Sequence, residues 1–119
     1  MSDNLQSIAE TLKSFAHDRA WDQYHSVRNL TLAMVGEVGE VAELVQWQSD
    51  EEVVEWLKTQ AGREKLGQEL ADVLLYLVRL SDVAGIDLVK AAQEKIRLNS
   101  ERYPVTKSHG TAKKYTELI

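Results

Sequence analysis

The chain contains no cysteine and only one proline among its 119 residues. Without cysteine there can be no disulfide bond, no zinc–thiolate site and no thiol nucleophile. The longest apolar run is VLLYLV, residues 73–78, which is far shorter than the roughly 20 residues of a membrane-spanning helix. The first ten residues have neither a basic region nor an apolar core, so we expect no signal peptide and a cytoplasmic protein.

Basic surface is also scarce, because the net charge is −5. This charge argues against binding to a nucleic-acid polymer, which needs a positive surface. It does not exclude a small anionic substrate, because a bound metal ion can reverse the local sign. Hydrophobic residues make up 44% of the chain and charged residues 28%, so we expect one globular domain over residues 1–119.

Apolar residues recur at helical spacing, and no segment alternates between polar and apolar residues, so the sequence predicts an all-α protein. Four main helices and one short helix are expected, and their approximate bounds are 3–18, 27–48, 49–58, 63–84 and 87–103. The short helix opens with a capping-box pattern, in which Ser49 is followed three residues later by Glu52. Residues 19–26 are expected to form a loop, and residues 103–119 a basic C-terminal tail.

Two of the expected helices carry acidic pairs inside their apolar stripes. At about 100° per residue, Glu40 lies roughly 60° from Glu37, and Asp72 lies roughly 60° from Glu69. Burial and mutual repulsion oppose the ionisation of four converging carboxylates. They must therefore protonate, pair with cations such as Arg79, or bind metal, and metal binding is the reading we favour.

The donor set indicates which metal would bind. Oxygen ligands without imidazole or thiolate suit Mg²⁺, or Mn²⁺ as a substitute. A di-iron oxidase bundle would carry Glu-x-x-His motifs, whereas the residues three beyond Glu37 and Glu69 are Glu40 and Asp72. All three histidines lie outside both acidic helices, so an oxidase bundle is disfavoured.

Both acidic segments resemble those of a known family. GEVGEVAELVQW and QELADVLLYLVRL are similar to the signature of the all-α nucleoside triphosphate pyrophosphohydrolases, the MazG-like superfamily, which reads E-E-x-x-E and then E-x-x-D. Gly36 stands where that signature has its first Glu, which resembles the dCTP pyrophosphatase branch. Three further segments are similar to that branch: RAWDQYHSVRNL, KIRLNSERYP and KKYTEL.

The resemblance implies a fold, an activity and a set of residue roles. The fold would be a MazG-like helical bundle. The activity would be hydrolysis of a nucleoside triphosphate, dCTP or a modified dCTP, to the monophosphate and pyrophosphate as nucleotide-pool house-cleaning. Catalysis and metal binding would fall to Glu37, Glu40, Glu69 and Asp72. Substrate binding would fall to Trp21, His25, Trp47, Tyr76, Lys95 and Asn99.

Two of these substrate residues also have a reading from position alone. Trp47 lies about two turns beyond Glu40 on the same helical side, where it could stack on a base. His25 could orient a phosphate or a water, or it could cap the second helix. In the first helix, Leu12 stands where the family commonly has a histidine.

The fourth expected helix is apolar nearly all round, which is typical of an interface. We therefore expect a homo-oligomer, and the resemblance implies a tetramer. A different class of function stays open, namely a non-catalytic nucleotide-sensing or antitoxin-like helical module that retains the acidic cluster.

Overall fold

Helices account for all the regular secondary structure in residues 3–119, the part of the chain that the computed structural model describes. The α-helices are α1 (Asp3–Asp18), α2 (Val27–Val45), α3 (Asp50–Leu57), α4 (Gln60–Val83), α5 (Leu88–Arg102) and α6 (Val105–Ser108). Two short 3₁₀ helices complete the list, η1 (Asp22–Tyr24) and η2 (Tyr115–Glu117). The all-α prediction is confirmed, although the described part has one more α-helix than expected.

Side-chain caps set where the helices begin. Ser26 caps α2 by accepting a hydrogen bond from the Asn29 amide at 3.0 Å, so the alternative role of His25 as that cap is wrong. Ser49 and Glu52 form the expected capping box of α3. Helix α4 begins three residues earlier than expected, because the Thr59 hydroxyl accepts from the Gly62 amide at 3.0 Å.

The C-terminal segment contains more helix than the sequence suggested. Helix α5 starts after its expected cap, Asp87, and ends at Arg102, before Pro104. The segment expected to be a plain tail then forms α6 and η2. The ring of Tyr115 contacts Tyr103 edge-on at 6.1 Å between centroids, which ties the end of this segment back to the end of α5.

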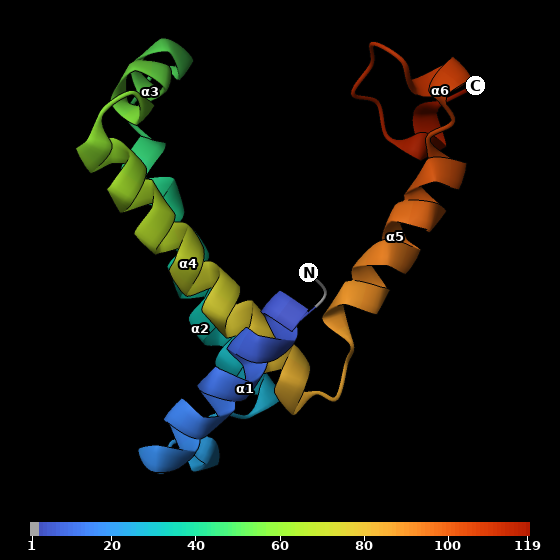
Figure 1. Ribbon diagram of the computed structural model, residues 1–119. Helices are drawn as coiled ribbons and strands as arrows, with labels where there is room; N and C mark the ends of the chain where they lie inside the picture. Colours follow the sequence, from blue (N-terminus) through green and yellow to red (C-terminus); the bar gives the residue numbers. More distant parts are fainter. Residues whose placement is uncertain (1–2) are drawn as a thin grey trace. The chain divides into compact units, whose positions relative to one another are not determined.

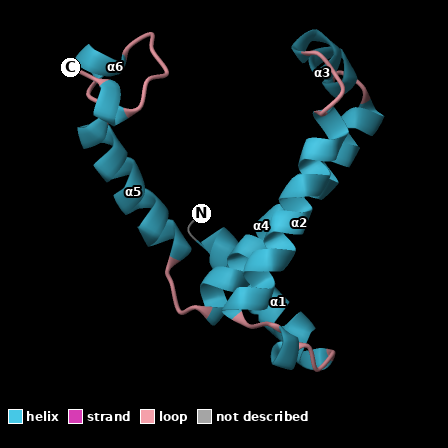
Figure 2. Cartoon of the chain, turned by 180° about the vertical axis from the view of Figure 1, so that it is seen from behind, coloured by secondary structure: helices cyan, strands magenta, loops and turns pink. Residues whose placement is uncertain are grey.

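The chain divides into two units, Met1–Ile86 and Asp87–Ile119. In the first unit, α2 and α4 run side by side along most of their length (Figure 1). Helix α1 packs on α4 at one end of this pair, and α3 contacts α4 at the other end, as the view from behind also shows (Figure 2). The single domain expected over residues 1–119 stays a prediction.

Few hydrophobic side chains are buried in the described part of the chain. The buried ones are Ala16, Leu30 and Val78. Large apolar side chains are exposed instead along the α2–α4 pair: Leu32, Val35, Val38, Leu70 and Leu74. An apolar surface of this kind is typical of a face that another protein surface covers. None of the helices in residues 3–119 is both long enough and apolar enough to span a membrane.

Candidate metal centre and adjoining cavity

Four carboxylates converge between α2 and α4. Glu37 and Glu40 come from α2, Glu69 and Asp72 come from α4, and one oxygen of each lies within 4.8 Å of the others. The three-residue spacing places both acids of a helix on one face, and the side-by-side packing of the helices turns the two faces together. The convergence predicted from the sequence is confirmed, and we call these four residues the acidic cluster.

The acidic cluster has more negative charge than its protein surroundings compensate. Hydrogen bonding to Glu37 and the charge of Glu37, followed by the same effects from Glu69, raise the pKa of Glu40 to about 7. The buried Oε2 atoms of Glu37 and Glu69 have no hydrogen-bond partner in the described part of the chain. Among the described residues, the cation paired with the cluster is Lys65, whose Nζ lies 3.2 Å from Glu69 Oε1.

These oxygens fit a hard divalent cation. Two oxygens on opposite sides of one Mg²⁺ ion lie about 4.2 Å apart, because each Mg–O distance is about 2.1 Å. Separations of at most 4.8 Å therefore need only small side-chain adjustments to enclose an ion. The unpartnered oxygens of Glu37 and Glu69 would gain the partner that they lack.

A largely apolar cavity of about 180 Å³ adjoins the acidic cluster. The residues that line it come from α1, the loop after it, α2 and α4: Leu12, Phe15, Trp21, His25, Leu30, Asp72, Leu75, Tyr76 and Arg79. Asp72 belongs to both the lining and the cluster, so the two features meet there. Other hollows along α1 have larger volumes but no acid of the cluster in their lining. An apolar, aromatic-lined cavity with a few polar groups suits a flat ring.

A buried arginine fixes the loop that carries Trp21. Arg79 donates from Nε to His25 Nδ1 at 3.0 Å and from Nη2 to Asp22 Oδ1 at 3.0 Å. Its Nη1 lies 3.6 Å from Asp82 Oδ2. The prediction that Arg79 could be a cation for the four acids is wrong, because its guanidinium pairs with Asp22 and Asp82 instead.

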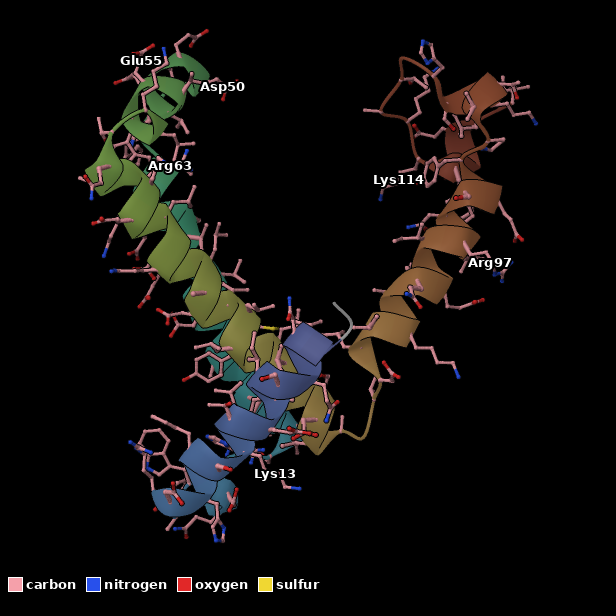
Figure 3. The ribbon with its side chains drawn as sticks, in the orientation of Figure 1. Lys13, Asp50, Glu55, Arg63, Arg97 and Lys114 are labelled. Atoms are coloured by element: carbon pink, nitrogen blue, oxygen red, sulfur yellow. The ribbon has the colours of Figure 1, made fainter. Side chains whose placement is uncertain are left out.

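Some of the predicted substrate residues line the cavity and others lie outside it. Trp21, His25 and Tyr76 meet in the cavity lining. Trp47 lies outside that lining and is 88% exposed, two residues after the end of α2 at Val45. Lys95 and Asn99 are exposed on α5, in the second unit, so their roles stay predictions. Figure 3 labels two other basic residues of that unit, Arg97 and Lys114.

Sequence reasoning missed several cavity residues. Phe15 follows Leu12 by three positions, and this spacing could have assigned both to one face of α1. Leu30 and Leu75 look like ordinary core positions. The partnership of Asp22 with Arg79 joins residues 57 positions apart, and no local pattern signals it.

Comparisons with known proteins decide the family. The MazG-like family matches residues 32–118. This chain belongs to the MazG-like family. It is 47% identical to dCTP pyrophosphatase 1 of Rattus norvegicus over 114 residues, which cover 96% of this chain and 67% of the relative. Identity to dCTP pyrophosphatase 1 of Homo sapiens is 44% over the same coverage.

A solved structure agrees with this assignment. The crystal structure of a pyrophosphatase from Archaeoglobus fulgidus superposes with a TM-score of 0.77 at 35% identity, covering 83% of this chain and 91% of that one. The acidic cluster and Tyr76 lie inside the range matched to the family, whereas Trp21 and His25 precede it. The resemblance noted in the sequence is confirmed at the level of the family and its helical fold.

Proposed function

We propose that this protein is a Mg²⁺-dependent nucleotide pyrophosphohydrolase that cleaves dCTP, or a modified dCTP, to the monophosphate and pyrophosphate. The observation that carries this proposal is the acidic cluster, with oxygens within 4.8 Å of one another beside an aromatic-lined cavity. The 47% identity to a dCTP pyrophosphatase supports the choice of nucleotide. Cleaning of the nucleotide pool is the expected role, and we expect it in the cytoplasm.

The charge of the substrate requires a cation. A nucleoside triphosphate carries about four negative charges, and in a medium of low dielectric constant these repel four carboxylates strongly. Glu37, Glu40, Glu69 and Asp72 would hold Mg²⁺, for which Mn²⁺ can substitute. An ion held there would neutralise phosphate charge and would make a bound water more acidic. We assign to Glu40 the further task of orienting the attacking water.

The cavity is suited to the base rather than to the whole nucleotide. Its volume of about 180 Å³ is below the roughly 300 Å³ at which pockets begin to enclose whole ligands. Trp21 and Tyr76 offer aromatic faces to a ring, and Asp72 lies where the cavity meets the acidic cluster. A nucleotide whose base fills the cavity would therefore leave its phosphates near the acids.

Three further residues are assigned to substrate binding from the family resemblance. Trp47 is 88% exposed, so its ring is accessible to the substrate. Lys95 and Asn99 lie four residues apart on α5, so their side chains share one face. A cation and an amide so placed suit phosphate oxygens.

A homotetramer is the proposed assembly. Its support is the exposed apolar surface of α2 and α4 and the small number of buried hydrophobic side chains among the described residues. Light scattering coupled to size-exclusion chromatography would measure the mass. Four times the chain mass is expected, and a monomer at micromolar concentration would refute the assembly.

One experiment tests the activity. The protein is incubated with each dNTP and with methylated dCTP in the presence of Mg²⁺, and released pyrophosphate is measured. We expect turnover of dCTP or its analogue above the other nucleotides. Saturable binding without turnover of any nucleotide would favour a nucleotide-sensing module instead.

Matched variants separate the acidic cluster from general charge effects. Glu40→Gln should reduce turnover about a hundredfold or more, as expected for loss of a group that acts in the transition state. Glu43→Gln is the control, because Glu43 is an exposed acid on the same helix and lies outside the cluster. Near-normal turnover by Glu40→Gln would remove the assignment.

A further inference from the structure

The contact between Arg79 and His25 determines which ring nitrogen of the histidine carries a proton. Arg79 is buried, and its Nε–H points at His25 Nδ1 with 3.0 Å between the nitrogens. An arginine has only donors and stays protonated. Nδ1 must therefore act as the acceptor, and the proton of the neutral ring must lie on Nε2.

Other contacts hold this arrangement in place. Asp22 accepts from Arg79 Nη2 at 3.0 Å, and the His25 amide donates to the Asp22 carbonyl oxygen at 3.1 Å. Asp82 lies 3.6 Å from Nη1. The guanidinium is thus held by Asp22 and Asp82, so its Nε has little freedom to turn away from His25.

The histidine also remains neutral in this setting. Burial, and then the positive charge of Arg79, lower the pKa of His25, and Asp22 opposes this only in part. Because Nδ1 is occupied, Nε2 is the ring nitrogen that a ligand can reach, and it can only donate.

We propose that Arg79 is a positioning residue that makes His25 a fixed hydrogen-bond donor to the nucleotide base in the cavity. Both side chains line that cavity together with Trp21, Tyr76 and Asp72. The matching ligand group is an acceptor, either a carbonyl oxygen or an unprotonated ring nitrogen, and a pyrimidine such as cytosine offers both on adjacent atoms. This inference rests on the proposed function, because it concerns the base of the same substrate.

A purely structural role for Arg79 makes different predictions. If the guanidinium only anchored the loop after α1, its loss would lower stability, and His25 would keep its proton on Nε2. If Arg79 positions a donor, its loss would let the proton move to Nδ1, and Nε2 would then become an acceptor. The base would lose a partner even in a well-folded variant.

The first test is the ¹⁵N NMR spectrum of the imidazole rings in the protein without nucleotide. The chain has three histidines, so the spectrum of His25→Gln identifies the signals of His25. We expect protonation at Nε2 alone in the unaltered protein and a mixture of both tautomers in Arg79→Met. Protonation at Nδ1 in the unaltered protein would overturn the proposal whether or not Arg79→Met folds. The NMR result does not depend on turnover. It can therefore refute the proposal about His25 while the proposed enzymatic function stands, and a failure to hydrolyse any nucleotide would leave the NMR result unaffected.

The second test is kinetic and uses paired variants. Arg79→Met should raise KM for dCTP about tenfold, the effect of one lost hydrogen bond, with kcat changed less than about threefold. Arg79→Lys retains a donor and should recover most of the loss. His25→Leu should raise KM as Arg79→Met does. His25→Gln, whose amide nitrogen can partly replace Nε2–H, should raise KM less than His25→Leu.

The control for this series is Asp22→Asn. This change weakens the ion pair with Arg79, but the Asn amide oxygen can still accept from Nη2 and the donation to His25 is kept. Stability should therefore fall slightly, and KM should rise much less than in Arg79→Met. Equal rises in KM for Asp22→Asn and Arg79→Met would indicate loop anchoring alone and overturn the proposal. An unchanged KM in His25→Leu would overturn it as well.

Discussion

Helix α4 carries two groups of charged residues with opposite character. At Glu69 and Asp72 it contributes to a cluster of four acids, with which Lys65 is the paired cation within residues 3–119. Two turns further on, Arg79 has its donors matched by Asp22 and His25. The Arg79 network is electrostatically complete, whereas the acidic cluster holds uncompensated charge. The difference supports both proposals, that Arg79 positions His25 and that the acidic cluster holds a cation.

The largest expected effect comes from removing one charge of the acidic cluster. Glu69→Gln should lower the turnover of dCTP about a hundredfold or more, because a metal ligand is lost. The same change should raise the melting temperature of the metal-free protein, because it relieves repulsion with Glu40. Calorimetry without Mg²⁺ and pyrophosphate release with Mg²⁺ measure the two effects. If the metal-free variant were less stable than the parent, the four acids would not repel one another in the absence of metal, which would contradict the account.

Adding Mg²⁺ should stabilise the folded protein, as Glu69→Gln does without metal. At about 100 times its Kd, Mg²⁺ should stabilise the folded protein by about 2.7 kcal/mol, because it binds the folded form alone. Thermal melts with Mg²⁺, with Mn²⁺ and after chelation give the comparison. Asp22→Asn should respond like the parent protein, while Glu37→Gln should lose most of the shift. An equal shift in both variants would place the metal outside the acidic cluster.

The pH dependence should distinguish the acidic cluster from the rest of the protein. The pKa of Glu40 is raised to about 7 in the folded protein without metal. Below that pH the carboxyl binds a proton that a cation must displace, so Mg²⁺ affinity should fall as the pH falls through about 7. Between the unfolded pKa and about 7, the folded state binds more protons than the unfolded state. The stability contribution of Glu40 in the metal-free protein is therefore lost as the pH rises through this window.

Titration calorimetry at about pH 6 and about pH 8, on either side of that pKa, tests this dependence. Affinity should be weaker at the lower pH, and Glu40→Gln should flatten the difference. An equal affinity at both values in the parent protein would contradict the account.

The smallest effect should come from the Arg79 network. Asp22 is half exposed, so solvent screens its ion pair with Arg79, and Asp22→Asn should cost about 0.5–1 kcal/mol. Asp22→Asn should lower the stability of the metal-free protein, whereas Glu69→Gln should raise it, because Asp22→Asn removes an attraction and Glu69→Gln removes a repulsion. Chemical denaturation measures it. A stabilising effect of Asp22→Asn would remove the contrast between the two groups.

Local periodicity explains what the sequence could predict. The acids of α2 and α4 repeat every three residues within apolar stripes, so their convergence followed once the two helices were assumed to pack. The caps at Ser49 and Asp87 could also be predicted from the sequence, because capping depends on residues that are close in the chain.

Contacts between distant segments explain what the sequence could not predict. Arg79 lies closer in sequence to Asp72 than to Asp22, yet packing turns it toward Asp22. Trp47 was expected on the acid-bearing face of a helix that ends two residues earlier. The start of α4 depends on Thr59, a cap that the apolar pattern alone does not reveal.

The most direct measurement is an anomalous difference map from crystals of the protein grown with Mn²⁺ and a non-hydrolysable dCTP analogue. The account predicts a manganese peak within bonding distance of oxygens of Glu37, Glu40, Glu69 or Asp72 and of the phosphates. Ordered carboxylates that hold no ion at saturating Mn²⁺, with the nucleotide bound elsewhere, would contradict it.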